Sequence, residues 1–199
     1  MSASRARVGM FGGAFDPPHR AHLALARAAI DQLRLDRLHV LPTGDAWHKA
    51  RTLTAGVHRL EMARLAFAGL PQVVVDPKEL ERSGPTYSID TLRELQAEHP
   101  QAELVLLMGE DQAAGFTRWR AWEDIARLAV LGVAGRGSGA GLAALRALPG
   151  VRVEGLRLPQ MPESATDIRA RLTAGQDIAE LVPPAVASYI ESHHLYQPT

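Results

Sequence analysis

The chain has 199 residues, zero formal net charge and no cysteine. This length fits one domain, residues 1–199, with a full hydrophobic core. A neutral chain lacks the bulk positive charge that attracts nucleic acid or an anionic membrane, so we expect neither as a partner. The absence of cysteine excludes disulfides and thiolate zinc sites. No apolar stretch reaches membrane-spanning length and no apolar leader core begins the chain, so we expect a cytoplasmic protein.

Short apolar runs alternate with helical patterns along the chain. We expect strands at residues 8–11, 38–41, 73–75, 104–108 and 130–133, and helices at 21–33, 56–68, 89–97 and 123–128. Two further helices are expected near the C-terminus, at residues 166–172 and 185–190. Several of the apolar runs are continuous, as in strands buried on both faces. The order predicts an α/β fold: a Rossmann-like, doubly wound parallel sheet with helices on both faces and additional C-terminal helices.

The segment after the first expected strand has the chemistry of a phosphate-binding turn. Residues 11–22 read FGGAFDPPHRAH. Gly12 and Gly13 lack a Cβ, so the backbone can turn sharply and approach a ligand closely. The following helix start offers free N–H groups to an anion. His19 and His22 are three residues apart, so both project from the first helical turn, where they can donate hydrogen bonds to phosphate oxygens and carry charge if the site raises their pKa values.

Other segments follow the remaining strands and so fall at the same edge of the expected sheet. These are residues 42–44, 109–111 and 135–137. Ligands of doubly wound sheets bind beyond this edge, at the carboxyl ends of the strands. The stretch 135–141 has four glycines in seven residues, which predicts a mobile loop, and Arg136 within it can reach a phosphate.

A second helix start with anion-binding character lies near the C-terminus. Ser164 and Asp167 have the spacing of a capping box, so a helix should begin there and present its N–H groups. The hydroxyl groups of Ser164 and Thr166 lie beside this helix start. Arg169, one turn inside, can make a two-pronged contact with a phosphate. We expect this segment to hold phosphate together with the first motif.

Other nucleotide-binding and metal-binding signatures are missing from the sequence. There is no G-x-x-x-x-G-K-[ST] loop and no G-x-G-x-x-G after the first strand. The pair His19 and His22 also has the spacing of metal ligands, but no further pattern of Cys, His or Glu ligands accompanies it, and zinc in proteins usually has three or four. We therefore expect no metal ion held by protein ligands.

With these motifs the chain resembles the bacterial nicotinate-nucleotide adenylyltransferases of the nucleotidyltransferase superfamily. The family pattern G-G-x-F-D-P-x-H-x-x-H is met by residues 12–22, with Ala21 where glycine is common. The pattern I-S-x-T-x-I-R is met by residues 163–169, with Glu163 at the apolar first position. Weaker matches follow in family order at residues 47–49, 84–88, 109–111, 119–123 and 182–196. The resemblance spans nearly the whole chain.

The residues and this resemblance together assign the expected site. The expected catalytic residues are His19, His22 and Arg169. The expected ATP contacts are Gly12, Gly13, Phe15, Gly109, Asp111, Arg136, Ser164 and Thr166, although Asp111 is also compatible with a helix N-cap. The expected contacts of the phosphate acceptor are Trp47, His48, Lys49, Thr86, Tyr87, Ser88, Trp119 and Arg120. Trp119 offers an aromatic face for stacking a pyridine ring.

The resemblance implies transfer of the adenylyl group of ATP to nicotinate mononucleotide, giving nicotinate adenine dinucleotide and pyrophosphate in NAD biosynthesis. Mg²⁺ would accompany ATP, held mainly by phosphates and water because the sequence has no carboxylate cluster for it. Two alternatives stay open at this point. One is an adenylyltransferase acting on nicotinamide mononucleotide or on another phosphate such as phosphopantetheine. The other is a nucleotide-binding regulator that has lost catalysis. The oligomeric state is also open.

Overall fold

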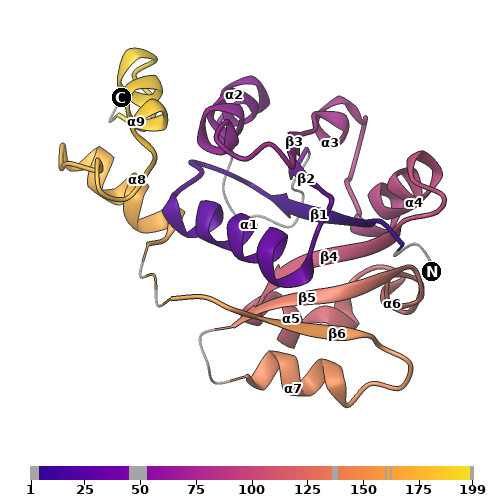
Figure 1. Cartoon of the computed structure of the whole chain (residues 1–199). Coiled ribbons are helices and arrows are strands. Elements are labelled where there is room, and N and C mark those ends of the chain that lie inside the picture. Colours follow the sequence, from indigo (N-terminus) through magenta and orange to yellow (C-terminus); the bar gives the residue numbers. More distant parts are fainter. Residues whose placement is uncertain (1–4, 45–52, 136–138, 160, 162, 198–199) are drawn as a thin grey trace.

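The computed structural model describes residues 5–44, 53–135, 139–159, 161 and 163–197. A parallel sheet of six strands lies at its centre, in the order β3-β2-β1-β4-β5-β6 (Figure 1). The strands are β1 (Arg7–Gly13), β2 (Arg37–Pro42), β3 (Val73–Val75), β4 (Glu103–Gly109), β5 (Ala129–Gly135) and β6 (Val153–Arg157). Because β1 pairs with both β2 and β4, the strand order reverses at β1, and sheets of this kind bind ligands at the carboxyl ends near that reversal.

Helices cover both faces of the sheet, which confirms the predicted fold class. One apolar cluster joins the sheet to α1 (Arg20–Leu33), α2 (Gly56–Phe67), α8 (Ala165–Thr173) and α9 (Pro184–Ser192). The other joins it to α4 (Ser88–Glu98), α5 (Glu110–Ala114), α6 (Trp122–Leu128), α7 (Ala140–Arg146) and the 3₁₀ turn η1 (Phe116–Arg118). A short helix, α3 (Lys78–Glu81), follows β3.

The central strands are buried on both faces, which explains their continuous apolar sequence. In β4, Leu104 and Leu106 belong to the cluster under α4, whereas Val105 and Leu107 belong to the cluster under α1. Each of these four side chains is at most 3% exposed. Burial of alternate side chains on opposite faces fixes the position of β4 between two helical layers, and with it the position of the turn that follows.

The structure contains elements that the apolar patterns did not predict, notably β6 and α7. In β6 only Leu156 is buried, because this strand lies at the edge of the sheet and its other side chains are partly or fully exposed. The predicted mobile loop at 135–141 is partly wrong. Gly135 ends β5 and Gly141 lies inside α7, which begins after Gly139 in the left-handed region at φ 61. Residues 136–138, with Arg136, lie outside the described residues.

The two predicted C-terminal helices are present as α8 and α9. They lie beyond the carboxyl ends of the strands, on the left of Figure 1, where β6 leads toward α8. The buried Ile168 of α8 and the buried Val186 and Ile190 of α9 belong to the cluster under α1. The C-terminal part of the chain is thereby placed next to the turn that follows β1. Among the described residues, no helix has both the length and the apolar character needed to cross a membrane.

Candidate active site

The two adjacent glycines after β1 have different structural roles. A Cβ added to Gly12 would meet no atom within 4 Å, so this position faces open space. A Cβ added to Gly13 would lie 3.0 Å from Cζ of Phe15. Phe15 is 1% exposed, adopts φ 47 and packs edge-on against Phe11, with ring centroids 5.3 Å apart. Gly13 therefore makes room for the Phe15 ring inside the turn, and Phe15 supports the turn from the core.

His19 and His22 lie together at the start of α1. Their ring centroids are 3.8 Å apart, and the His19 backbone N–H donates to Nδ1 of His22 over 3.2 Å. Since Nδ1 of His22 accepts this bond, a neutral His22 ring carries its proton on Nε2. The His22 ring also packs on Phe15, with centroids 5.0 Å apart. The orientation of His22 is thus set by the helix start and by the aromatic cluster behind it.

Burial keeps His19 neutral in the free protein. Its side chain is 7% exposed, and desolvation lowers the pKa of His19 to about 4. The condition under which this histidine would carry charge, a raised pKa, is therefore not fulfilled in the free protein, where His19 is a neutral hydrogen-bonding group. Its Nδ1 is buried and has no hydrogen-bond partner within the described part of the chain.

The described residues contain no group of three or more His, Cys, Asp or Glu suited to a metal ion.

The second helix start meets the first at the Asp16 backbone. Arg169 of α8 donates from Nη1 to the Asp16 carbonyl oxygen over 2.7 Å and from Nη2 to Oγ1 of Thr166 over 3.1 Å. Ser164 is the N-cap of α8, as predicted: its Oγ accepts from the Asp167 backbone N–H at 3.1 Å and donates to the Asp167 carboxylate at 2.6 Å. The fold therefore brings together two motifs that lie at opposite ends of the sequence.

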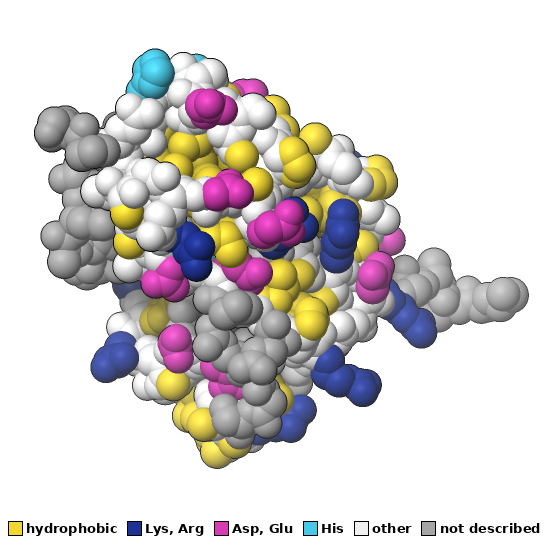
Figure 2. Space-filling view, turned by 90° about the vertical axis from the view of Figure 1, so that its left-hand side faces the viewer, with side chains coloured by type: hydrophobic (Ala, Val, Ile, Leu, Met, Phe, Trp, Pro, Cys, Tyr) yellow, Lys and Arg dark blue, Asp and Glu magenta, His cyan; other side chains and the backbone are white. Residues whose placement is uncertain are grey.

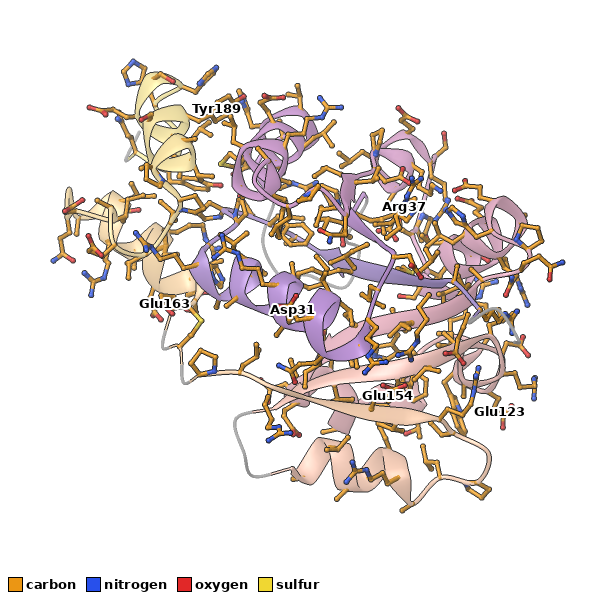
Figure 3. All side chains as sticks on the ribbon, in the orientation of Figure 1. Asp31, Arg37, Glu123, Glu154, Glu163 and Tyr189 are labelled. Carbon is orange, nitrogen blue, oxygen red and sulfur yellow. The ribbon has the colours of Figure 1, made fainter. Side chains whose placement is uncertain are left out.

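Glu163 stands where the family pattern has an apolar residue. It lies immediately before α8 (Figure 3) and is partly buried. Its Oε2 is inaccessible to solvent and forms no hydrogen bond with the described residues. Nothing in the structure explains why a carboxylate occupies this position.

A cavity of about 710 Å³ opens beside the Gly12–Gly13 turn. Seven of its lining residues were expected in the site: Gly12, Gly13, Thr86, Tyr87, Ser88, Trp119 and Arg120. Nine further lining residues were not assigned as contacts from the sequence, although Ala14 and Thr43 lie in segments that it placed at this edge: Met10, Ala14, Thr43, Glu79, Leu106, Leu107, Gln112, Arg118 and Ile125. The cavity lies at the carboxyl ends of β1 and β4, where the strand order reverses, and its size suits a mononucleotide or a similar ligand.

Aromatic and basic side chains line the wall of the cavity formed by η1 and the start of α4. Trp119 is partly buried against Phe116, with ring centroids 5.8 Å apart, and it lines the cavity. Arg120 lies over the Tyr87 ring, with Cζ 4.4 Å from the centroid. Arg118, which the sequence analysis did not assign, is exposed and also lines the cavity. This wall can therefore stack a flat ring and attract a negative charge.

The segment after β4 caps a short helix. Gly109 is the N-cap of α5, and its N–H donates to Oε1 of Gln112 over 3.1 Å. Asp111 lies in the first turn of α5 and is exposed, so an N-cap role for it is wrong. Gly109 and Asp111 do not line the cavity, although their neighbour Gln112 does. The expected acceptor residues Trp47, His48 and Lys49 lie outside the described residues.

Charges of both signs are mixed on the face of the molecule that contains this edge of the sheet. Figure 2 shows Lys and Arg side chains interspersed with Asp and Glu across the described part of this face. With zero net charge on the chain, binding of a polyphosphate depends on individual donors such as Arg169 and on helix starts rather than on a broad positive surface.

Glu79 is a buried carboxyl group among the cavity-lining residues. It is 4% exposed and accepts a hydrogen bond from Oγ1 of Thr91 at 2.9 Å, and Thr91 in turn accepts from Arg82 at 3.2 Å. Burial raises the pKa of Glu79 to about 7, against the opposing effects of the Thr91 hydrogen bond and the Arg82 charge. Between pH 4.5 and about 7 the folded protein therefore holds more protons than the unfolded chain, so this group makes stability fall as pH rises through that window.

We expect Glu79→Gln to become more stable relative to the original protein as pH rises. Its neutral amide still accepts from Thr91 but avoids burying a charge, which costs about 3 kcal/mol above pH 7 for a shift of this size. The difference in melting temperature between variant and original should grow by roughly 5 °C or more from pH 5 to pH 8 in thermal unfolding scans. Glu81→Gln, an exposed change in the same short helix, is the control and should show no such trend. A difference in melting temperature between Glu79→Gln and the original protein that stays constant from pH 5 to pH 8 would contradict the raised pKa.

Comparison with known proteins identifies the family. The cytidylyltransferase-like family model matches residues 10–171. A probable nicotinate-nucleotide adenylyltransferase of Albidiferax ferrireducens is 54% identical over 194 residues, which cover 96% of this chain and 98% of that relative. A relative of the same description from Bordetella petrii is 48% identical over 197 residues, covering 96% of this chain and 99% of its own.

Solved structures of low sequence identity share the fold. Plasmodium falciparum nicotinic acid mononucleotide adenylyltransferase complexed with APC has a TM-score of 0.79 at 19% identity, covering 96% of this chain and 97% of its own. The same enzyme complexed with NaAD has a TM-score of 0.76 at 20% identity, with the same coverage. With the sequence identities above, which extend over nearly the whole of both chains, the chain belongs to the nicotinate-nucleotide adenylyltransferase family, within the cytidylyltransferase-like proteins.

Proposed function

We propose that residues 1–199 act as one nucleotidyltransferase domain that transfers the adenylyl group of ATP to nicotinate mononucleotide, releasing nicotinate adenine dinucleotide and pyrophosphate. The observation that carries this proposal is the contact of Arg169 with the Asp16 carbonyl. This contact joins the two helix starts that we assign to phosphate, at one edge of the sheet. The cavity with Trp119 and the segment 86–88 opens at the same edge.

The reaction is an in-line displacement that needs no general base. The 5′-phosphate of the mononucleotide is ionised at neutral pH, so its oxygen can attack the α-phosphorus of ATP directly. A new P–O bond forms there, the bond to the bridging oxygen breaks, and pyrophosphate leaves with the electron pair. Catalysis then consists of positioning the two phosphates and stabilising the charge that develops on their oxygens.

His19 and His22 are suited to the α-phosphate and the bridging oxygen. His22 presents its Nε2–H because Nδ1 is occupied by the His19 backbone N–H. His19 is neutral in the free protein, and an adjacent phosphate would raise its pKa, so ATP binding can bring a proton to this ring. Close approach of ATP to the backbone is possible at Gly12, where the structure has open space, and Gly13 and Phe15 hold that turn.

Arg169 and the start of α8 are suited to the β- and γ-phosphates. The Ser164 and Thr166 hydroxyl groups lie at this helix start, and Arg169 already lies between Thr166 and the first motif. We assign Gly109 and Asp111 to the adenosine end of ATP, since they follow β4 at the same edge of the sheet. Arg136 follows β5 at that edge and is assigned to phosphate.

The acceptor is assigned to the cavity. The face of Trp119 would stack on the pyridine ring, and the backbone N–H groups of residues 86–88 would bind the nicotinate carboxylate. Arg120, held over Tyr87, adds positive charge to the same wall, as does Arg118. Trp47, His48 and Lys49 complete the proposed acceptor contacts. The Plasmodium structure of similar fold, which holds NaAD, supports a dinucleotide of this kind as the product.

ATP would enter as its magnesium complex. The described residues offer no group of three acidic or imidazole ligands, so the ion would be held by phosphate oxygens and water, where it neutralises charge. We expect no nucleic acid or membrane partner and a cytoplasmic location. The oligomeric state is not assigned.

A panel of acceptors tests the function. With ATP and Mg²⁺, we expect pyrophosphate release with nicotinate mononucleotide at a kcat/KM well above that with nicotinamide mononucleotide, because the basic wall favours a carboxylate. Phosphopantetheine and a reaction without an acceptor are the controls. A preference for the amide would assign the chain to the alternative acceptor, and no release with any acceptor would favour a binding protein without catalysis.

A further inference from the structure

Asp16 joins three distant segments of the chain to the turn that follows β1. Its side chain is 1% exposed, and its Oδ1 accepts a hydrogen bond of 2.6 Å from the hydroxyl group of Tyr196. Its Oδ2 accepts from the Thr54 backbone N–H at 3.3 Å, and its carbonyl oxygen accepts from Arg169. Asp16 lies three residues before His19, so whatever fixes Asp16 also fixes the position of that histidine.

Tyr196 reaches Asp16 through an unusual backbone turn after α9. Both His194 and Tyr196 adopt left-handed conformations, with φ 49 and φ 63, which residues other than glycine seldom adopt. Such a conformation persists only where surrounding contacts hold it. For Tyr196 these contacts are the apolar cluster under α1, against which it packs, and the Thr173 hydroxyl, whose proton is shared between the carbonyl oxygens of Arg169 at 3.0 Å and Tyr196 at 3.4 Å.

The hydroxyl group of Tyr196 is a permanent donor to Asp16. Burial raises the pKa of Tyr196, and the negative charge of Asp16 raises it further, whereas a hydrogen bond with Thr54 and the positive charge of Arg169 act in the opposite direction. The group therefore stays protonated at any pH at which the protein works. Because a hydroxyl–carboxylate contact of this length is among the stronger hydrogen bonds, it can hold the turn in one position.

We propose that Tyr196 is a positioning residue for adenylyl transfer, whose hydroxyl group, acting through Asp16, fixes the turn that carries His19 and receives Arg169. Tyr196 itself touches neither substrate. This inference rests on the proposed function. It assigns a role to the C-terminal segment, which lies outside both phosphate-binding motifs. That role is to align the turn after β1 with the start of α8.

The expected effect is on turnover rather than on substrate binding. Small displacements of groups that position reacting atoms lower the rate of the chemical step strongly. We therefore expect Tyr196→Phe to lower kcat roughly 10-fold, with the KM values for ATP and nicotinate mononucleotide changed much less. The phenylalanine ring keeps the apolar packing, so the variant should fold.

Tyr189→Phe is the matched control. Tyr189 belongs to α9 (Figure 3), and its hydroxyl group contacts Nδ1 of His58 in α2 at 3.0 Å. The control loses a hydroxyl group and a hydrogen bond from the same part of the chain without touching Asp16. We expect it to keep its kcat. An unchanged kcat in Tyr196→Phe, or equal losses in both variants, would overturn the proposal.

Amide hydrogen exchange gives a readout that is independent of activity. Tyr196→Phe should speed exchange in a peptide covering residues 14–22 and leave β4 and β5 unchanged. If exchange were faster to the same extent in residues 14–22 and in β4 and β5, Tyr196 would only stabilise the fold as a whole, and the proposal would be overturned. A double-mutant cycle with Asp16→Asn should give non-additive losses in kcat, because Tyr196→Phe removes the same contact that the neutral amide weakens. If the original protein does not turn over nicotinate mononucleotide, the proposed function fails, whereas the exchange experiment still decides the role of Tyr196.

Discussion

We expect His22→Ala to lower kcat by about 10²-fold or more, the loss typical of removing a donor to developing negative charge. The structure gives the reason. His22 is oriented by the His19 backbone N–H and by the Phe15 ring, so its remaining ring nitrogen is a fixed proton donor, which we assign to the phosphate of ATP. Steady-state rates of pyrophosphate release at saturating ATP and acceptor measure the effect.

Two amide variants separate the structural and catalytic roles of His22. In His22→Asn the side-chain oxygen can replace Nδ1 as acceptor for the His19 N–H, so the helix start and the melting temperature should be preserved while kcat stays low. In His22→Gln the amide N–H₂ reaches closer to the position of Nε2, so part of the kcat should return. A nearly normal kcat in His22→Ala would refute the assigned role, as would full recovery in His22→Asn.

Arg169→Ala should lower both activity and stability. The arginine is assigned to the leaving pyrophosphate, so we expect kcat to fall by about 10²-fold. It also donates to the Asp16 carbonyl in a residue that is 1% exposed. Loss of that donor leaves a buried acceptor unsatisfied, which costs about 1–3 kcal/mol in the free energy of unfolding. Kinetics and denaturant unfolding measure the two effects separately.

Two further variants test the Arg169 assignment. Arg169→Lys keeps the charge but not the planar fork, so we expect an intermediate kcat. Arg171→Ala removes an exposed arginine from the same helix and should change neither kcat nor the free energy of unfolding by much. The assignment fails if Arg169→Ala loses stability but keeps its kcat, because the arginine would then serve only to join α8 to the turn.

The fold and the two helix starts were accessible from local sequence patterns. The continuous apolar runs of β4 and β5 indicated strands buried on both faces, and the structure confirms this. The capping pair Ser164 and Asp167 marked the start of α8 correctly. In each case a few neighbouring residues suffice for the prediction, because strand burial and helix capping depend on the sequence of a single element.

The parts that sequence reasoning missed depend on contacts between distant elements. β6 has a single buried side chain, Leu156, so it leaves no apolar run to detect. Gln112 and Arg118 reach the cavity from α5 and η1, which are too short for a periodic pattern. Two partners of Asp16 lie 153 and 180 residues further along the chain, at Arg169 and Tyr196. No local pattern encodes such pairings, and the roles assigned to the site residues stay predictions.

The position of β1 between β2 and β4 has a consequence for how the protein is made. β1 is synthesised first, yet its partner β4 lies nearly half of the chain away. On the ribosome β1 can pair with β2 early, but the edge that faces β4 must wait while several further elements emerge. Arg169 and Tyr196 arrive later still. The proposed phosphate site therefore combines the turn after the first strand with residues of α8 and of the segment after α9, which are translated after all six strands.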